Sequence, residues 1–446
     1  MNKKQQIRSS FLYMPPLILG SLLPFITIPV YTRILTPQDY GFLALAMIYA
    51  AFMSGLANFG VSLAFDRNYF QYRNDPKKLA QLFYSSLAFV STNFVILAFL
   101  TYVFKKNISI ILTGSDQYGG LILATFASHF VLNIAIGFYF TYFKNSEKAK
   151  IHTQYKLVST VLSFFLSLFL VAYIRVGVIG IVMSRLITGV LLFLFFLNLL
   201  KKKLPFALNK NILLESLKIS YPLTPRIIIS VLNTQFDKYM IGLMASVSGV
   251  GIYHIGKRIG NSVFVFMTAL QNVFQPQVYK RMFNQNEHTR KSIGSYLTPF
   301  LYISTALSLC TALFSKELIT ILTPVSYHGA IPIVSILAVY FGSMFFGKIP
   351  QLLYVKKTHI STALFLLSFS FNVGLNIPFI MRFGALGAAW ATMLAGLISG
   401  SISLIVAQHY YRINYEWKKI IWIMGTFFTG AITIISMHLL TSPYLW

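Results

Sequence analysis

The sequence has 446 residues, of which 56% are hydrophobic and 11% are charged, and its mean hydropathy is +0.68. A soluble domain carries about 25% charged residues, so this composition excludes a water-soluble globule and indicates a chain solvated by lipid. The formal net charge of +27 would suggest a nucleic-acid partner in a soluble protein, but the basic residues lie between apolar runs, so membrane topology explains them better and no nucleic acid is expected.

The first apolar run covers residues 11–32 and follows Lys3, Lys4 and Arg8. It is too long for the apolar region of a signal peptide, and no small-residue cleavage site follows it. We therefore predict a first membrane span with a cytoplasmic N-terminus.

Further apolar runs of about 20 residues follow along the whole chain, each long enough to cross a bilayer as a helix. On the side of the N-terminus, the intervening loops carry roughly four times as many Lys and Arg residues as the loops on the other side, which places that side in the cytoplasm. We predict thirteen spans, centred near Leu22, Phe52, Phe94, Phe130, Phe164, Val190, Ser230, Val263, Ser304, Tyr340, Leu367, Gly396 and Gly430.

The two halves of the chain resemble each other at a nearly constant offset. Matching residues are 210 positions apart in the earlier blocks and 207 apart in the last block. The pairs are Pro15 with Pro225, Gly41 with Gly251, Gly119 with Gly329, Arg175 with Arg382, Gly177 with Gly384, Gly180 with Gly387, and Gly189 with Gly396.

This repeat predicts an all-α polytopic membrane protein with two parallel six-helix lobes, residues 1–205 and 206–410, and an extra span in 411–446. An even number of spans lets both lobes enter from the same side, related by a pseudo-two-fold axis along the membrane normal. A cavity between such lobes allows alternating access. An odd total leaves the C-terminus outside, unless the last run is interfacial or a terminal span is absent.

Two groups of residues inside the spans need an explanation. Pro15 and Pro225 occupy matching positions, and proline kinks a membrane helix by removing a backbone donor. These kinks are either static or bend at the mouth between the lobes. Asp237 and Arg258 lie at similar distances on either side of the turn SVSGVG, so Asp237 can pair with Arg258 or with Lys257.

The other cations outnumber the acids, and they include Arg226 and Lys238. Cations that face a cavity would suit a diphosphate or an acidic sugar. Arg185 in the sixth span is a further candidate, because the repeat has threonine there. Lys348 either snorkels to the inner face or, like Asp237 and His129, is a candidate for an ion pair or for coupling to an ion. His129 in the fourth span is either a proton relay or a buried, hydrogen-bonded histidine.

The segments TRILTPQDYGFLALA and GVGIYHIGKRIG, with the segment from Pro222 through Asp237 and Lys238, resemble Wzx-type flippases of O-antigen oligosaccharide repeat units. These belong to the polysaccharide transport family, in the MOP superfamily that also holds multidrug exporters and peptidoglycan-precursor flippases. The resemblance covers about residues 1–410. It implies a MATE-like two-lobed core of twelve helices, from which this chain departs by its thirteenth span.

The resemblance also implies a function. Such proteins move an undecaprenyl-diphosphate-linked oligosaccharide from the inner to the outer leaflet of the bacterial inner membrane, by alternating access coupled to H⁺, Na⁺ or the membrane potential. The resemblance implies that the cations that meet the diphosphate and the sugars in the cavity are Arg226, Lys238, Lys257 and Arg258. Membrane lipids, a polysaccharide polymerase and a chain-length regulator are the implied partners.

Two other functions are weighed against a flippase. A multidrug or cation antiporter of the same superfamily would need acidic groups in its cavity, and only Asp237 lies clearly within a span. A membrane glycan polymerase or ligase would need catalytic carboxylates near the surface, but the longest outer loops, 104–118 and 315–328, hold one acid each. The single cysteine, Cys310, and the scattered histidines exclude a disulfide framework and favour no metal. No cofactor and no enzymatic activity are therefore expected.

Overall fold

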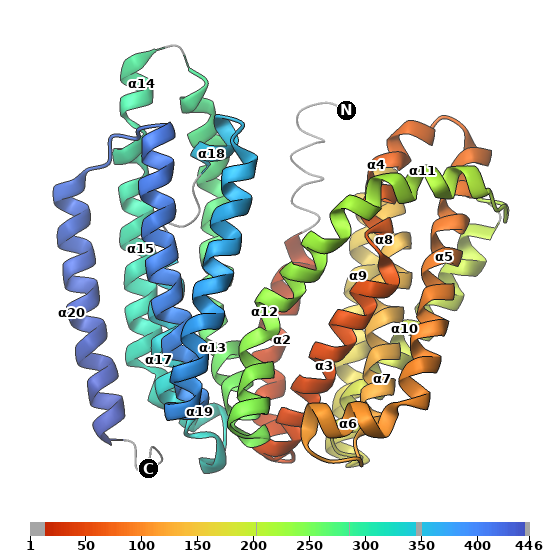
Figure 1. The fold of residues 1–446 in the computed structure, drawn as a ribbon, viewed down its shortest axis with the longest axis horizontal. Coiled ribbons are helices and arrows are strands. Elements are labelled where there is room, and N and C mark those ends of the chain that lie inside the picture. Colours follow the sequence, from red (N-terminus) through yellow and green to blue (C-terminus); the bar gives the residue numbers. More distant parts are fainter. Residues whose placement is uncertain (1–13, 202, 285, 345–349, 442–446) are drawn as a thin grey trace. The chain divides into compact units, whose positions relative to one another are not determined.

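The computed structural model describes residues 14–201, 203–284, 286–344 and 350–441, and it contains helices and no strand within these ranges (Figure 1). The chain divides into two compact units, Met1–Tyr239 and Met240–Trp446. The first therefore includes the segment that follows residue 205. The lobe boundaries given above stay predictions.

The first unit is formed by long helices and by short ones of 9 to 12 residues, which are α4, α6, α7, α8 and α11. A π-helical turn, Phe130–Ala135, joins α7 to α8, and a 3₁₀ turn, Tyr221–Leu223, joins α11 to α12. The helices are α2 (Met14–Thr32), α3 (Pro37–Asn58), α4 (Val61–Tyr72), α5 (Pro76–Val103), α6 (Lys105–Thr113), α7 (Gly119–His129), α8 (Ile136–Asn145), α9 (Ala149–Leu168), α10 (Val178–Lys201), α11 (Lys210–Ser220) and α12 (Thr224–Met244), whose last residues belong to the second unit.

The second unit is also helical. Its longest element, α19, is interrupted at Gly384, where φ is 55° and ψ is −132°, so it consists of two arms joined by a turn. Its helices are α13 (Val247–Met282), α14 (Glu287–Lys291), α15 (Ile293–Leu313), α16 (Ser315–Leu322), α17 (Ala330–Ser343), α18 (Gln351–Tyr354), α19 (Thr358–Tyr410) and α20 (Trp417–Thr441).

Eight helices among the described residues are long and apolar enough to cross a membrane. Each of the thirteen predicted span centres lies within a helix, so the predicted helical segments are confirmed, while the number of spans stays a prediction. The two segments that were predicted to be outer loops, 104–118 and 315–328, contain the helices α6 and α16. At 1.5 Å per residue these helices are too short to cross a bilayer, and α6 lies across the end of its unit (Figure 1).

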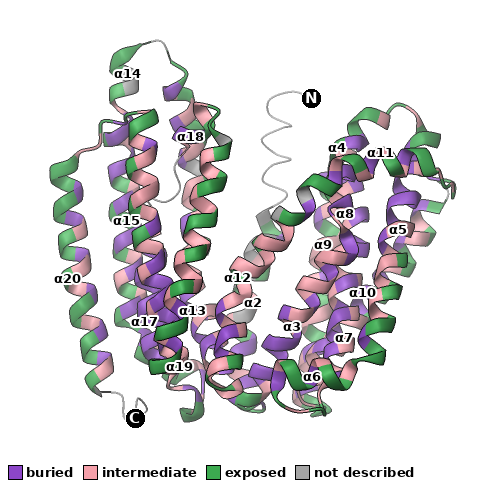
Figure 2. Ribbon diagram, in the orientation of Figure 1, coloured by how far each residue is buried: buried purple, intermediate pink, exposed green. Residues whose placement is uncertain are grey.

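Aromatic side chains fill the interior of the first unit. Phe83 of α5 lies between Phe65 of α4 and Tyr139 of α8, with ring centroids 5.8 and 5.0 Å apart, and Tyr139 stacks on Phe196 of α10 at 5.2 Å. Such edge-to-face and stacked pairs add to the packing that holds the four helices together. In both units the buried residues gather between helices, while α20 exposes much of its surface (Figure 2).

Local structure recurs at the offsets found in the sequence. Thr36 and Ser246, 210 residues apart, cap α3 and α13 by accepting hydrogen bonds from the amides of Asp39 and Gly249, at 3.2 and 3.0 Å. Hydroxyl side chains are favoured at this position because they satisfy a backbone donor that the helix leaves open. The repeat is therefore present in the helix N-caps as well as in the amino-acid sequence.

The motif R-x-G-x-x-G ends a span in each half. Gly177 and Gly384 both have positive φ, 69° and 55°, a conformation that glycine adopts without strain. Three residues later, a Cβ on Gly180 would lie 2.9 Å from a Val176 methyl, and one on Gly387 would collide with the Phe379 carbonyl oxygen. In each motif the first glycine turns the chain, and the second lets the helix after the turn approach the residues before it.

Candidate functional site

In the first unit, two predicted site residues lie close together. His129, the last residue of α7, has its Nδ1 3.0 Å from the Ser54 hydroxyl of α3, and the charge of Arg185 of α10 acts on its ring. The three helices pack against one another. The sequence had placed His129 and Arg185 in separate spans without linking them. The hydrogen bond fits the reading of His129 as a bonded structural histidine, and the proton relay stays a prediction.

Helix α12 carries the second group of candidates. Asp237 is 2% exposed, and the half-buried Lys238 donates from Nζ to the Gln235 side-chain oxygen at 3.1 Å. Gln235 and Lys238 are three residues apart and so share one face of the helix. The side chain of Arg226 and the whole of Lys348 lie outside the described residues. No placement is therefore given for these two candidates.

Helix α13 places the candidates of the second unit. The ammonium of Lys257 lies 5.4 Å from the centroid of the Tyr253 ring, and Lys257 and Arg258 are both half-buried. The Tyr253 hydroxyl in turn lies 3.5 Å from the hydroxyl of Thr392 on α19, the residue that corresponds to Arg185 of the first half. Asp237 and Arg258 belong to different units, and their pairing stays a prediction.

One predicted bend lies near the start of its helix, and the other lies where the described residues begin. Pro225 is the second residue of α12, directly after the 3₁₀ turn, and Pro15 is the second described residue of α2. In the first turn of a helix the backbone N–H has no partner within the helix, so proline costs no hydrogen bond there. The irregularity near Pro225 is therefore the turn before it. Flexing at either proline stays a prediction.

Sequence reasoning missed a polar network between α4 and α11. The Tyr72 hydroxyl donates to Glu215 at 2.5 Å, the Gln71 amide donates to the other carboxylate oxygen at 3.0 Å, and the Asn68 amide donates to the Ser216 hydroxyl at 3.1 Å. A lone glutamate among the apolar, basic and polar residues of the short helix α11 was the signal that could have revealed it. This network fixes which face of α11 lies against α4.

The network predicts a pH-dependent stability. The hydrogen bond from Tyr72 holds the pKa of Glu215 below its ordinary value, while burial, with the charge of Glu215, raises the pKa of Tyr72 to about 12. Because the pKa of Glu215 is lower in the folded state than in the unfolded state, where it is about 4.3, the ionised carboxylate stabilises the fold at a pH above that unfolded pKa. This contribution is lost as the pH falls through the folded-state pKa. We expect Glu215→Gln to unfold at lower temperature than wild type at pH 7, with the gap closing towards pH 3.

Thermal unfolding followed by the circular dichroism of the helices across this pH range measures the gap. Tyr72→Phe removes the donor and should reproduce the effect of Glu215→Gln in part. A gap that stays constant from pH 7 to pH 3 would show that this carboxylate contributes nothing by its charge.

A second missed group lies in the other unit. His438 of α20 is 8% exposed, and its Nδ1 lies 2.9 Å from the Ser335 hydroxyl of α17 and 3.1 Å from the Ser315 hydroxyl of α16. Buried polar groups of this kind need such partners. They join the last helix to the rest of its unit. No group of three or more His, Cys, Asp or Glu residues that could hold a metal lies within the described parts of the chain.

The fold matches known membrane transporters. The lipid II flippase MurJ in its inward closed conformation aligns with a TM-score of 0.72 and 15% identity over 98% of this chain and 93% of its own. An inward-facing multidrug resistance MATE family transporter of the MOP superfamily gives 0.64 and 16% over 90% and 97%. The MATE transporter VcmN of Vibrio cholerae gives 0.57 and 14% over 92% and 97%. At these identities the likeness shows the fold.

The protein therefore has the fold of a multi-pass transporter of the MOP superfamily, which confirms the predicted fold class but leaves the exact repeat count open. Residues 30–332 match the family described as polysaccharide biosynthesis protein, and the chain belongs to this family. This match confirms the resemblance found in the sequence motifs. No curated protein sequence matches the chain significantly.

Proposed function

We propose that the protein is a flippase for a lipid-linked oligosaccharide, an undecaprenyl-diphosphate-linked repeat unit such as that of O-antigen. It moves this substrate from the inner to the outer leaflet of the bacterial cytoplasmic membrane by alternating access. The observation that carries the proposal is the family match over residues 30–332, on a chain that aligns over 98% of its length with a protein named as a lipid II flippase.

The charges within the spanning helices support an anionic substrate. Arg185, Lys257 and Arg258 are half-buried on α10 and α13. A cation at the centre of a membrane helix costs about 2.5–3.5 kcal/mol even on lenient insertion scales, and such residues usually face protein or a water-filled cavity. A diphosphate would supply the negative charge, since arginine can donate two parallel hydrogen bonds to it and lysine acts as a point charge.

The basic loops support a cytoplasmic N-terminus, and H⁺, Na⁺ or the membrane potential drives transport. A polysaccharide polymerase and a chain-length regulator would receive the product. The second candidate function is a multidrug or cation antiporter, which is favoured by the likeness to MATE transporters and by the buried Asp237.

Proteoliposomes containing a fluorescent polyprenyl-diphosphate oligosaccharide test the proposal. We expect the full-length protein to make the fluorophore accessible to a quencher on the other side of the membrane, under a gradient of pH, Na⁺ or potential. Liposomes without protein give the baseline. Failure of correctly folded protein under every gradient would contradict the flippase, and gradient-driven efflux of an organic cation in the same vesicles would favour the antiporter.

A further inference from the structure

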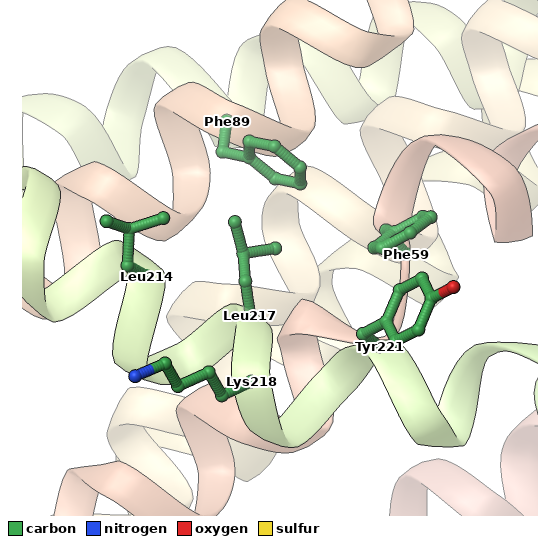
Figure 3. Close-up of a pocket in the computed structure, with 6 residues that line it drawn as sticks. All are labelled: Phe59, Phe89, Leu214, Leu217, Lys218 and Tyr221. Atoms are coloured by element: carbon green, nitrogen blue, oxygen red, sulfur yellow. The ribbon is translucent and has the colours of Figure 1, made fainter.

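A pocket of about 580 Å³ lies in the first unit, between α11 and the helices that precede it in the chain. Most of its lining is aliphatic or aromatic, with one charged group. The lining residues are Phe59, Phe89, Leu214, Leu217, Lys218 and Tyr221 (Figure 3). Its size lies within the range of pockets that bind small ligands. None of these residues belongs to the candidate site described above.

The side of the pocket formed by α11 follows from helical spacing. Leu214, Leu217, Lys218 and Tyr221 are separated by three, four and seven residues, so they share one face. Glu215 lies at the edge of this face, three residues before Lys218, whose charge acts on it, and it accepts the hydrogen bond from Tyr72 that holds the helix to α4. The residues that fix α11 are therefore separate from those that line the pocket.

The far end of the pocket is held by the chain itself. Helix α3 ends at Asn58 and α4 begins at Val61, and the two residues between them, Phe59 and Gly60, have φ values of 49° and 73°. A Cβ on Gly60 would lie 3.0 Å from the Ser220 carbonyl oxygen, and the Thr224 hydroxyl donates to the Phe59 carbonyl at 3.1 Å. These contacts place the rings of Phe59 and Tyr221 with their centroids 6.0 Å apart. The pocket is therefore formed before any ligand arrives.

The lining defines the ligand as a hydrocarbon chain with an anionic head. Leu217 points towards Phe89, whereas the ammonium of Lys218 extends away from the Phe59 and Tyr221 rings (Figure 3). An apolar chain can lie between the aliphatic and aromatic side chains. A phosphate near Lys218 would form a charge-assisted hydrogen bond with the ammonium. A zwitterionic head would gain less, because its cation would be repelled.

Charge around the pocket indicates which lipid this is. Lys201, Lys203, Lys210 and Lys218 are all exposed, on the end of α10, the segment after it, and α11. The predicted topology places this basic segment in the cytoplasm, and basic clusters beside a membrane helix attract the anionic lipids of the cytoplasmic leaflet. An anionic phospholipid is abundant at this surface and complements these lysines.

We propose that this pocket is a binding site for one acyl chain of an anionic phospholipid of the cytoplasmic leaflet, with Lys218 pairing with the headgroup phosphate. The inference does not depend on which substrate the protein carries.

Equilibrium binding of fluorescent dioleoyl phosphatidylglycerol to the full-length protein in detergent micelles tests the site. We expect saturable binding by wild type, roughly tenfold weaker binding by Lys218→Gln, and near wild-type binding by Lys291→Gln, which removes the same charge from an exposed position of the other unit, outside the basic segment. Phosphatidylcholine should bind roughly tenfold more weakly than phosphatidylglycerol.

A second pair of variants tests the apolar part. Leu214→Trp should fill the pocket and weaken phosphatidylglycerol binding, whereas Leu208→Trp places the same bulk at an exposed position outside the lining. Thermal unfolding shows whether each variant is folded. If Leu214→Trp does not fold, the comparison of wild type with Lys218→Gln still tests the proposal, because Lys218 is exposed and its replacement leaves the packing intact. Equal binding by wild type and Lys218→Gln would overturn the proposal, as would tighter binding of polyprenyl phosphate than of phosphatidylglycerol.

Discussion

Replacing Gly387 with alanine should destabilise the second unit by about 3 kcal/mol, the upper part of the range for overpacking a tight contact. The new Cβ would collide with the carbonyl oxygen of Phe379, which lies on the first arm of α19, before the turn at Gly384. Backbone cannot move aside as the end of a flexible side chain can. The measurement is the thermal unfolding midpoint of the purified protein, and Gly384→Ala should lower it as well, because alanine is strained at positive φ.

Gly374→Ala is the matched control for these variants. It lies in the first arm of the same helix, and nothing is within 4 Å of its added Cβ. Alanine in a helix interior is favoured over glycine by roughly 0.5–1 kcal/mol, so this variant should be as stable as wild type or slightly more stable. An unfolding midpoint of Gly387→Ala equal to that of Gly374→Ala would show that the two arms do not approach as closely as described.

Transport should fall roughly tenfold or more when Lys257 or Arg258 is replaced by glutamine. A hydrogen bond to a charged group contributes about 1.5–3 kcal/mol, and 1.4 kcal/mol corresponds to a factor of ten. Both residues are half-buried on α13, where a cation that bound no anion would be costly. The proteoliposome assay measures the rate, and Arg258→Lys should recover part of it because the charge is kept.

Lys291→Gln serves as the control, since Lys291 is exposed and pairs with Glu287 within the short helix α14. Its transport rate should equal that of wild type. The Lys257 ammonium also rests on the Tyr253 ring, so unfolding midpoints separate lost transport from lost folding. Wild-type rates in both Lys257→Gln and Arg258→Gln would remove these residues from the substrate path.

Much of the fold is predictable because a bilayer imposes one requirement on every span, an apolar run of about 20 residues whose backbone bonds to itself. The R-x-G-x-x-G motif was found by its repetition, and its structural role follows from the left-handed glycine. Other features depend on contacts between distant residues. The break at Phe59 carries no local signal beyond Gly60, and it becomes understandable only beside Ser220.

The candidate site was harder to predict from the sequence than the fold. Individual charges such as Arg185 stand out because they are rare in apolar runs. The residues that contact the candidate residues do not stand out in the sequence. Ser54 beside His129 and Thr392 beside Tyr253 are ordinary residues that matter only because helix packing brings them there. Glu215 was overlooked for a related reason, because its partner Tyr72 lies 143 residues earlier in the chain.

The π-helical turn at Phe130–Ala135 has a consequence for insertions and deletions. Such a turn holds one residue more than the α-helical turn it replaces, and successive helix residues point about 100° apart. It therefore sets the angle between the face on which His129 meets Ser54 and the face on which Tyr139 enters the aromatic core. Loss of one residue here would rotate one face against the other. The length of this stretch should therefore be more constrained than the identity of its side chains.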